Sequence, residues 1–353
     1  MGDSLDYMEG SRMKKLLLPQ GVNSYKACLH THTTLSDGTK TPEEIKELYM
    51  AQGYSVIAYT DHDVFICHDD LCDEHFIALN GYELEVTEPL TDSVIGSVRT
   101  CHMCFIARDQ AARMQVCYNK DKYIREKHAD LREKLTFDRD DYERVYSHEG
   151  VNDMMRLGRE NGFFVSYNHP TWSQESYPEY SGYQGMQAME VVNGACCAMG
   201  YDEINTRVYD DLLRQGKRIF CTATDDVHRI ERDAFRGWVV FRAKELTYPC
   251  IIDALEKGSF YASTGPDILD LWVEAGHVHV KTSPVHAIRM DTGARHSGIV
   301  SSGDWENTVD EAEFELRPTD RYFRIDAVDV HGGRAFSNAC WLDELGTEAP
   351  VNT

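Results

Sequence analysis

Histidines and acidic residues recur at short spacings in the first two thirds of this chain. His30 and His32 are two residues apart in "CLHTHTTLSDG", and Asp37 follows in the same polar stretch. Side chains alternate in direction along an extended chain, so His30 and His32 project to the same side and can bind one metal ion. Imidazole is a good ligand for Zn²⁺, Fe²⁺ and Mn²⁺. Taken alone, an H-x-H pair occurs by chance in many soluble chains and more often belongs to a polar loop than to a metal site.

Five further segments carry the same residue types. They are "YTDHD" with Asp61, His62 and Asp63, "NGYELE" with Glu83, "TCHMCF" with His102, "YNHP" with His169, and "TDDVH" with Asp226 and His228. Imidazoles and carboxylates together can hold a cluster of divalent ions, with carboxylates as bridges. Each segment also has a structural alternative as a polar junction or turn. Glu85 and Glu88 compete with Glu83, and Asp225 competes with Asp226.

Strand-like and helical segments alternate around these residues and must position them. The expected strands are "KACLH", "YSVIAYT", "FIALNGYELEV", "VRTCHMCFIA", "FFVSYNHP", "AMEVVNG", "RIFCTATDDVH", "WVVFRA" and "SFYASTGP". Helices are expected near residues 41–52, 151–161, 206–215 and 248–257, the first opened by a capping box at Thr41 and Glu44. Seven or eight of these strands, separated mostly by helices, predict a parallel sheet and, at this length, an α/β barrel. Most of the polar residues follow strand ends, which meet on one face of a barrel, and His102 lies near the start of its strand.

The rest of the chain has a different texture. Residues 1–24 form an N-terminal extension, residues 25–266 the expected barrel, residues 267–345 a small antiparallel β-sandwich-like domain, and residues 346–353 a tail. A charged insertion interrupts the barrel at about residues 108–149, and "DKYIREKHADLREKL" is its clearest predicted helix. This insertion is expected to be a solvated face, with a lid over the site as the alternative.

Composition limits the classes of partner. Asp and Glu exceed Lys and Arg by 59 to 36, which gives a net charge of -23 and argues against nucleic acid as a stable partner. A small phosphorylated substrate is compatible with this charge, because metal ions can supply local positive charge. The apolar run Leu16–Leu18 is too short for a signal peptide or a membrane span, so no membrane partner is expected. The oligomeric state is not specified by the sequence.

Cysteine usage predicts a reducing compartment. The chain has 11 cysteines without regular spacing, which is typical of free thiols in a cytoplasmic protein. Cys101 and Cys104 form a C-x-x-C pair, yet no second pair follows at zinc-ribbon spacing. We therefore expect buried strand cysteines here rather than a zinc site.

In this order, the six segments resemble the PHP (polymerase and histidinol phosphatase) superfamily of metal-dependent hydrolases, over about residues 25–266. "GSFYASTGP" and "YFRIDAVDVHGGRAFSN" resemble a branch with an appended C-terminal β-domain. The resemblance implies a distorted (βα)7 barrel with two or three divalent metal ions (Zn, Mn or Fe). It implies a first ion held by His30, His32, Glu83 and Asp226, a second by Glu83, His102 and His169, and a third by Asp37, His62 and His228.

The resemblance also implies a metal-dependent phosphoesterase that hydrolyses a small phosphate monoester or diester by a metal-bridging hydroxide. Asp61 would orient a ligand histidine. Asp63 or Asp225 would handle leaving-group protons or be solvated, and Arg229 would contact phosphate or form an ordinary salt bridge. Two alternatives remain: hydrolysis of aryl esters or carbamates, as in some members of that branch, and a non-catalytic ligand-binding protein that uses its β-domain.

Overall fold

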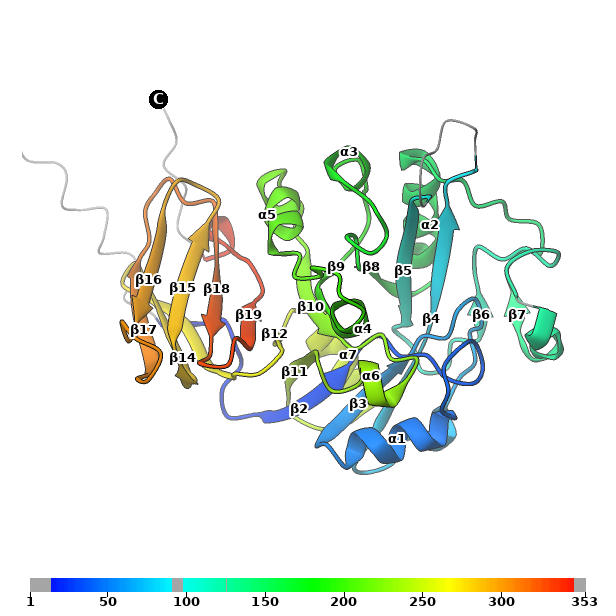
Figure 1. Ribbon diagram of the computed structural model, residues 1–353, viewed down its shortest axis with the longest axis horizontal. Helices are drawn as coiled ribbons and strands as arrows, with labels where there is room; N and C mark the ends of the chain where they lie inside the picture. The colour runs from blue at the N-terminus through cyan, green and yellow to red at the C-terminus, as the bar shows by residue number, and fades with distance from the viewer. Residues whose placement is uncertain (1–13, 91–97, 125, 346–353) are drawn as a thin grey trace, which may run out of the picture.

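The computed structural model of the chain describes residues 14–90, 98–124 and 126–345. The predicted tail and residues 1–13 of the predicted extension lie outside these ranges. The helices are α1 (Pro42–Met50), α2 (His148–Glu160), α3 (Tyr177–Tyr180), α4 (Gly194–Ala198), α5 (Thr206–Arg214), α6 (Ile230–Asp233) and α7 (Tyr248–Glu256), with 3₁₀ turns η2 (Asp69–Leu71), η3 (Glu126–Lys134) and η4 (Leu342–Leu345). Few helices therefore accompany a large amount of β-structure (Figure 1).

One large mixed sheet of 14 strands forms the centre of the fold. Seven of its strands neighbour one another in the order β10 (Phe220–Thr224), β9 (Ala188–Asn193), β8 (Phe163–Asn168), β5 (Thr100–Ala107), β4 (Ile77–Thr87), β3 (Tyr54–Tyr59) and β2 (Asn23–Cys28). Strand β5 runs antiparallel to both β4 and β8, whereas the other neighbours in this series are parallel. The prediction of a parallel sheet is wrong at β5, because residues 88–99 leave little room for the helix that a parallel crossover needs.

The sheet continues beyond β2 through antiparallel strands. These are β11 (Trp238–Ala243), β12 (Phe260–Ser263), β19 (Arg334–Ser337), β18 (Tyr322–Val328), β15 (Ala287–Thr292) and β16 (Ser297–Ser301), with β20 (Cys340–Trp341) beside β18. A second sheet holds β1 (Lys15–Leu16), β13 (Ile268–Glu274), β14 (His277–Val285) and β17 (Val309–Glu315). A separate apolar cluster joins this second sheet to β15 and β18, where Val278, Val280, Ile288 and Ile325 are buried.

The strands after residue 267 are antiparallel, as their alternation of apolar and polar residues predicts. The sequence did not predict β15 and β16. Strand β19 pairs with β12, so hydrogen bonding continues from the α/β part into this region. The domain boundary at residues 266 and 267 therefore stays a prediction.

The helix signals of the sequence are confirmed at the expected places. Thr41 caps α1 through a capping box with Glu44, and Gly53 and Gly162 follow α1 and α2 with positive φ. The insertion differs from its prediction. Its charged stretch forms the 3₁₀ segment η3, between the short paired strands β6 (Met114–Gln115) and β7 (Thr136–Phe137), because it has too few apolar residues for a buried helical stripe.

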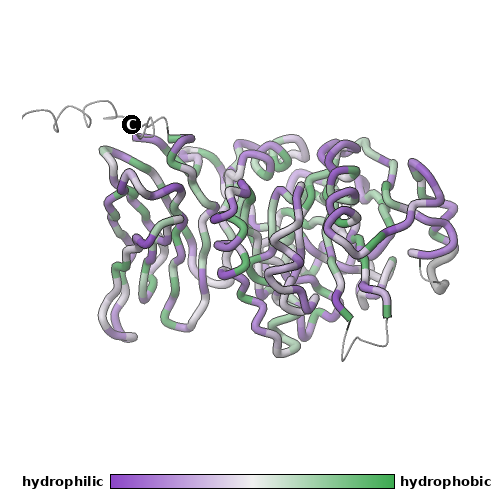
Figure 2. Tube along the Cα trace, turned by 90° about the horizontal axis from the view of Figure 1, so that it is seen from above, coloured by the Kyte–Doolittle hydropathy of each residue, from purple (hydrophilic) through white to green (hydrophobic). Residues whose placement is uncertain are grey.

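The insertion lies at one end of the molecule and the C-terminal strands at the other (Figure 1). Figure 2 shows polar and apolar residues interspersed throughout the chain. No helix in the described residues combines the length and apolar character needed to cross a membrane.

The two outer strands of the seven-strand series approach each other through the residues that follow them. Thr31 and Val227 form one isolated parallel bridge, and the His32 amide donates to the Val227 carbonyl at 3.1 Å. In the described residues no ladder pairs β2 with β10 themselves. A closed barrel thus stays a prediction, while the bridge brings His30, His32 and Asp226 together.

Candidate metal centre

The first pair of predicted ligands follows β2 and is fully enclosed. His30 and His32 are 0% and 1% exposed, and their Nε2 atoms lie 3.0 Å apart. This contact agrees with the prediction that two residues in i, i+2 register project to one side. The Asp226 amide donates to the His30 carbonyl at 3.0 Å, which places the end of β10 beside the pair.

Asp37 returns to the same place through a tight loop. The Gly38 amide donates to the Thr33 carbonyl, and a Cβ at Gly38 would lie 2.4 Å from the His32 carbonyl oxygen, so only glycine fits there. Asp37 Oδ1 lies 3.3 Å from His228 Nε2, and its Oδ2 lies 3.8 Å from His62 Nε2. These contacts bring the three residues of the expected third site together.

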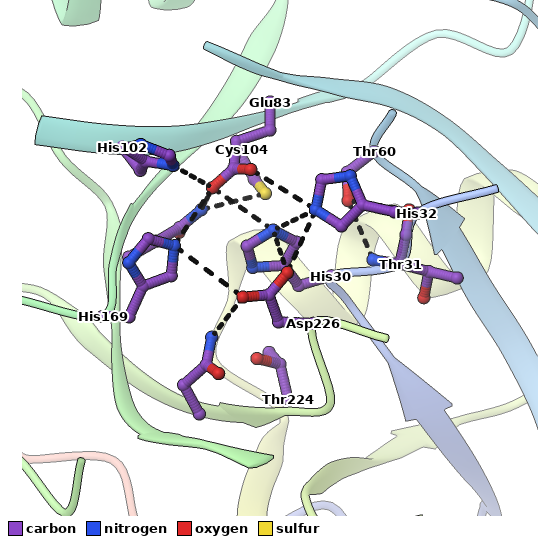
Figure 3. A network of polar contacts seen from close by, with 12 residues as sticks. His30, Thr31, His32, Thr60, Glu83, His102, Cys104, His169, Thr224 and Asp226 are labelled. Atoms are coloured by element: carbon purple, nitrogen blue, oxygen red, sulfur yellow. Dashed lines mark hydrogen bonds and ion pairs between the residues drawn. The ribbon is translucent and has the colours of Figure 1, made fainter. Parts of the chain in front are cut away.

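Glu83 lies at the centre of the cluster (Figure 3). Its Oε1 lies 3.2 Å from His30 Nε2, 3.2 Å from His102 Nδ1 and 3.3 Å from His169 Nε2. Its Oε2 lies 3.4 Å from His32 Nε2 and 3.2 Å from His62 Nδ1. Glu83 is 1% exposed, and its carboxylate therefore contacts five imidazoles in an enclosed space.

Asp226 follows β10, which lies at the other end of the seven-strand series from β2, and it contacts His30 and His32. Its Oδ1 lies 3.0 Å from His32 Nε2 and 3.3 Å from His30 Nε2, and its backbone has a φ of 53°. Asp225, the competing residue, turns away from the cluster. It accepts hydrogen bonds from the Tyr49 hydroxyl and from the amides of residues 235–237, so it closes a loop.

The crowding of opposite charges changes the acid–base properties of the cluster. Burial opposes protonation of His32, but Asp226 and Glu83 outweigh it and raise the His32 pKa to about 10. Burial of Glu83 acts against its ionisation, yet the surrounding histidines hold its pKa well below the ordinary value. For His62, burial and the neighbouring His32 lower the pKa to about 3. The cluster thus contains both ionised carboxylates and a neutral imidazole.

The donor set fits divalent metal ions. His62 Nδ1 and Asp226 Oδ1 are buried and have no hydrogen-bond partner in the described residues, although such atoms nearly always have one. Two imidazole nitrogens facing each other at 3.0 Å likewise leave a lone pair uncompensated unless a proton or a cation lies between them. The donor atoms of four sets lie within 4.8 Å of one another: His32, Asp37, His62 and His228; His30, Glu83 and His169; His30, His32 and Asp226; and His62, Glu85 and His102.

The second ring nitrogen of most of these histidines has its own partner. His30 Nδ1 lies 2.7 Å from Glu190, His169 Nδ1 lies 3.3 Å from Ser173 Oγ, and His228 Nδ1 lies 2.9 Å from the Asp226 carbonyl. Such contacts orient metal-binding imidazoles in proteins. They leave Nε2 of these histidines directed at the centre of the cluster.

Three further predicted residues lie around this cluster rather than in it. Asp61 accepts hydrogen bonds from the Thr33 amide at 2.7 Å and from the Ser36 hydroxyl at 2.7 Å, so it fixes the loop that carries Asp37. It reaches His32 only through Ser36, whose hydroxyl lies 3.4 Å from His32 Nδ1. The predicted direct orientation of a histidine by a carboxylate is instead seen between Glu190 and His30.

Asp63 is enclosed by the insertion. Its Oδ1 lies 2.5 Å from an Arg144 nitrogen, and Arg144 also donates to the carbonyls of Glu85 and Cys117. Burial raises the pKa of Asp63 to about 6, although Arg144 acts in the opposite direction. Solvation of Asp63 at a loop, the alternative kept from the sequence, does not occur.

A cavity of about 350 Å³ lies over the cluster. Its walls include several predicted ligands and the predicted substrate contact Arg229, together with Trp172, Met199 and Arg232. Arg229 is exposed, and within the described part of the chain its side chain forms no ion pair, contrary to the preferred salt-bridge interpretation. A group bound in this cavity would contact both the cluster and a free guanidinium.

Sequence reasoning missed several residues of the site. Glu190 stands alone among apolar residues in "AMEVV", which is the only signal that could have indicated it. Trp172 lies edge-on to His102 and His169, with ring centroids 5.2 and 5.1 Å apart, and it follows the "NHP" motif without any signal of its own. Cys101 and Cys104, in contrast, are buried and free in β5, as predicted.

No model of a known protein family and no curated protein matches this chain. Solved structures that match it include a two-domain protein from Bacteroides vulgatus that contains a predicted PHP-like metal-dependent phosphoesterase, with 15% identity, a TM-score of 0.45, and coverage of 92% of this chain and 98% of that one. A putative metal-dependent phosphoesterase from Bifidobacterium adolescentis has 16% identity, a TM-score of 0.36, and coverage of 57% and 87%. An amidohydrolase from Chromobacterium violaceum, with bound sulfate and no metal, has 15% identity, a TM-score of 0.37, and coverage of 59% and 89%.

Proposed function

We propose that this chain is a metal-dependent phosphoesterase that hydrolyses a small phosphate monoester or diester. The observation that carries the proposal is the convergence of six buried ligand candidates, with the Glu83 carboxylate among them, beneath a cavity. They come from segments far apart in the sequence: His30, His32, Glu83, His102, His169 and Asp226. A purely structural role does not account for buried donor atoms without hydrogen-bond partners.

The ligand sets of the proposal are those that the sequence resemblance implies. His30, His32, Glu83 and Asp226 would hold a first ion, and Glu83 would share its carboxylate with a second ion at His102 and His169. Asp37, His62 and His228 would hold a third. We take the ions to be Zn, Mn or Fe, because imidazole-rich sets with carboxylates suit them. A distorted (βα)7 barrel and a cytoplasmic location belong to the same proposal.

Bound divalent ions would supply Lewis acidity, which would polarise the ester and lower the pKa of water at the site to about 7. The residues of the chain do the remaining work. Asp61 holds the loop that carries Asp37, and Glu83 keeps five imidazoles around one centre. Arg229 in the cavity wall would attract an anionic substrate, whereas the Arg232 guanidinium is already paired with Asp233, and Trp172 would exclude water on another side.

The Arg229 guanidinium favours a phosphoester over a neutral aryl ester or carbamate, since planar Arg donors match phosphate oxygens. An activity panel separates these functions. We would assay 4-nitrophenyl phosphate, bis(4-nitrophenyl) phosphate and 4-nitrophenyl acetate with Mn²⁺ or Zn²⁺ present. Phosphoester turnover that is lost in both His169→Ala and Asp226→Asn is the expected result.

Acetate ester turnover above phosphoester turnover, lost in the same variants, would replace the phosphoesterase with an esterase. Metal-loaded protein that hydrolyses none of the three would contradict a hydrolytic role for these bonds. Arg229→Ala should raise KM for the phosphoester more than it lowers kcat, because it contacts substrate rather than the metal ligands.

A further inference from the structure

Strand β9 is the exception among the seven strands from β2 to β10. The other six carry or immediately precede a predicted metal ligand, whereas β9 carries none. Its one charged residue, Glu190, is 1% exposed and lies between β8 and β10 in the sheet. Burying a carboxylate in a strand is costly unless it has partners, so its contacts indicate what it does.

Glu190 has a partner for each of its lone-pair positions. Its Oε1 accepts from His30 Nδ1 at 2.7 Å and from the Thr224 hydroxyl at 2.7 Å. Its Oε2 accepts from the Asn193 side-chain amide at 3.0 Å and from the His169 backbone amide at 3.1 Å. An ionised carboxylate has about four such positions, and four donors therefore fix its orientation completely.

These contacts reach three strand ends of the proposed metal centre. The His30 ring follows β2, and the His169 amide follows β8, where His169 has a positive φ of 26°. Asn193 also donates to Asp226 Oδ2 at 3.2 Å, beyond the end of β10. The Glu190 carboxylate thus fixes the His30 ring, the backbone at His169 and, through the Asn193 side-chain amide, the Asp226 carboxylate.

We propose that Glu190 is a positioning residue for the metal centre, which keeps His30 in the Nδ1–H tautomer and its Nε2 lone pair directed at the first ion. The inference rests on the proposed function, because it assumes that His30 binds metal. A carboxylate behind a ligand histidine raises the basicity of the imidazole and fixes its ring, and loss of such a contact typically costs 10–100-fold in metal affinity. Glu190 itself belongs to none of the candidate ligand sets and does not line the cavity.

The test is Co²⁺ titration of the full chain, followed by calorimetry and by the visible absorption of the bound ion. Glu190→Gln keeps the shape of the side chain and removes its charge. We expect its tightest site to bind Co²⁺ about 10–100-fold more weakly than wild type, with a changed visible spectrum. Glu175→Gln is the matched control, because Glu175 is also a buried glutamate but hydrogen-bonds only to tyrosines.

The Glu175→Gln control should stay within about threefold of wild type. Glu190→Gln within that range, or a control that weakens binding as much as Glu190→Gln, would overturn the inference. Wild-type protein that binds no Co²⁺ would instead overturn the proposed metal centre itself.

Nitrogen-15 NMR of histidine-labelled wild type provides a measurement that does not depend on the folding of a variant. With metal bound, His30 should be in the Nδ1–H tautomer. Protonation at Nε2 in the loaded protein would contradict the role of Glu190.

Discussion

The buried polar clusters around Glu175 and around Glu83 differ in how their charges are compensated. Around Glu175, Tyr146 and Tyr167 donate hydroxyl hydrogen bonds at 2.9 and 2.5 Å, and Tyr183 donates another. Around Glu83, five imidazole nitrogens lie at 3.2–3.4 Å, and the Asn168 side-chain amide donates to Oε1 at 2.9 Å. The Glu175 carboxylate is thus satisfied by neutral donors alone, whereas the Glu83 carboxylate has one neutral donor and otherwise faces groups that are themselves candidate ligands.

The difference indicates which cluster needs a cation. Buried tyrosine hydroxyls complete the Glu175 cluster within the protein, and none of its carboxylate or hydroxyl atoms is without a hydrogen-bond partner in the described residues. In the described residues, the Glu83 cluster leaves His62 Nδ1 without a hydrogen-bond partner, although Glu83 Oε2 lies 3.2 Å away. Hydrogen-bond satisfaction therefore separates a structural polar core from a candidate metal centre, whereas burial alone does not.

The buried pair of Arg144 and Asp63 carries its own cation, and breaking it should have the largest effect on stability. Arg144→Met leaves Asp63 buried without a counter-ion, so the free energy of unfolding should fall by about 3–5 kcal/mol. Urea unfolding of the variant measures this loss. Adding Asp63→Asn to Arg144→Met should recover part of it, and a single variant as stable as wild type would show that the pair does not anchor the insertion.

Asp226→Asn should have the next largest effect, on metal affinity. The amide oxygen is neutral and the variant removes a ligand of the proposed first ion, so affinity should fall at least ~100-fold, beyond the range for residues that only orient ligands. Chelator competition measures this change. Asp225→Asn is a poorer control because Asp225 closes a loop, and we use Glu175→Gln, which should bind metal as wild type does.

Glu175→Gln should have the smallest effect, about 1–2 kcal/mol on unfolding, from weakened tyrosine hydrogen bonds. Burial raises the pKa of Glu175 above 4.5, although Tyr167, Tyr183 and Tyr146 oppose this and Glu179 adds to it. The folded state thus holds the Glu175 proton more tightly than the unfolded state does. The stabilisation that this proton gives to the folded state is therefore lost as pH rises above about 4.5. The unfolding free energy of wild type should therefore fall relative to that of Glu175→Gln from pH 4.5 upward. A difference that stays constant with pH would contradict the raised pKa.

Much of the site could be predicted because its residues follow local rules. His30 and His32 lie next to each other because an extended chain has a side-chain period of two. Helix α1 has Thr41 as its N-cap because the capping box depends only on the four residues from Thr41 to Glu44. Ligand candidates at strand ends were predicted from the order of strands and motifs. These features depend on short stretches of sequence, so a reader of the sequence can find them.

The features that could not be predicted depend on residues distant in the sequence. Asp225 and Asp226 differ in role because amides ten and more residues later bind Asp225. Arg144 reaches Asp63 from an insertion whose fold has no clear pattern, and Glu190 meets His30 across 160 positions. The antiparallel direction of β5 likewise follows from the space available for a connection rather than from the strand's own residues.

The measurement that tests the central claim most directly is metal stoichiometry. Purified wild type, stripped with chelator, would be titrated with Mn²⁺ and with Zn²⁺ and its bound metal counted by elemental analysis after dialysis, beside Asp226→Asn. The account predicts two or three equivalents bound to wild type and at least one equivalent fewer in the variant. Less than one equivalent in wild type, with the protein folded, would contradict a metal centre around Glu83.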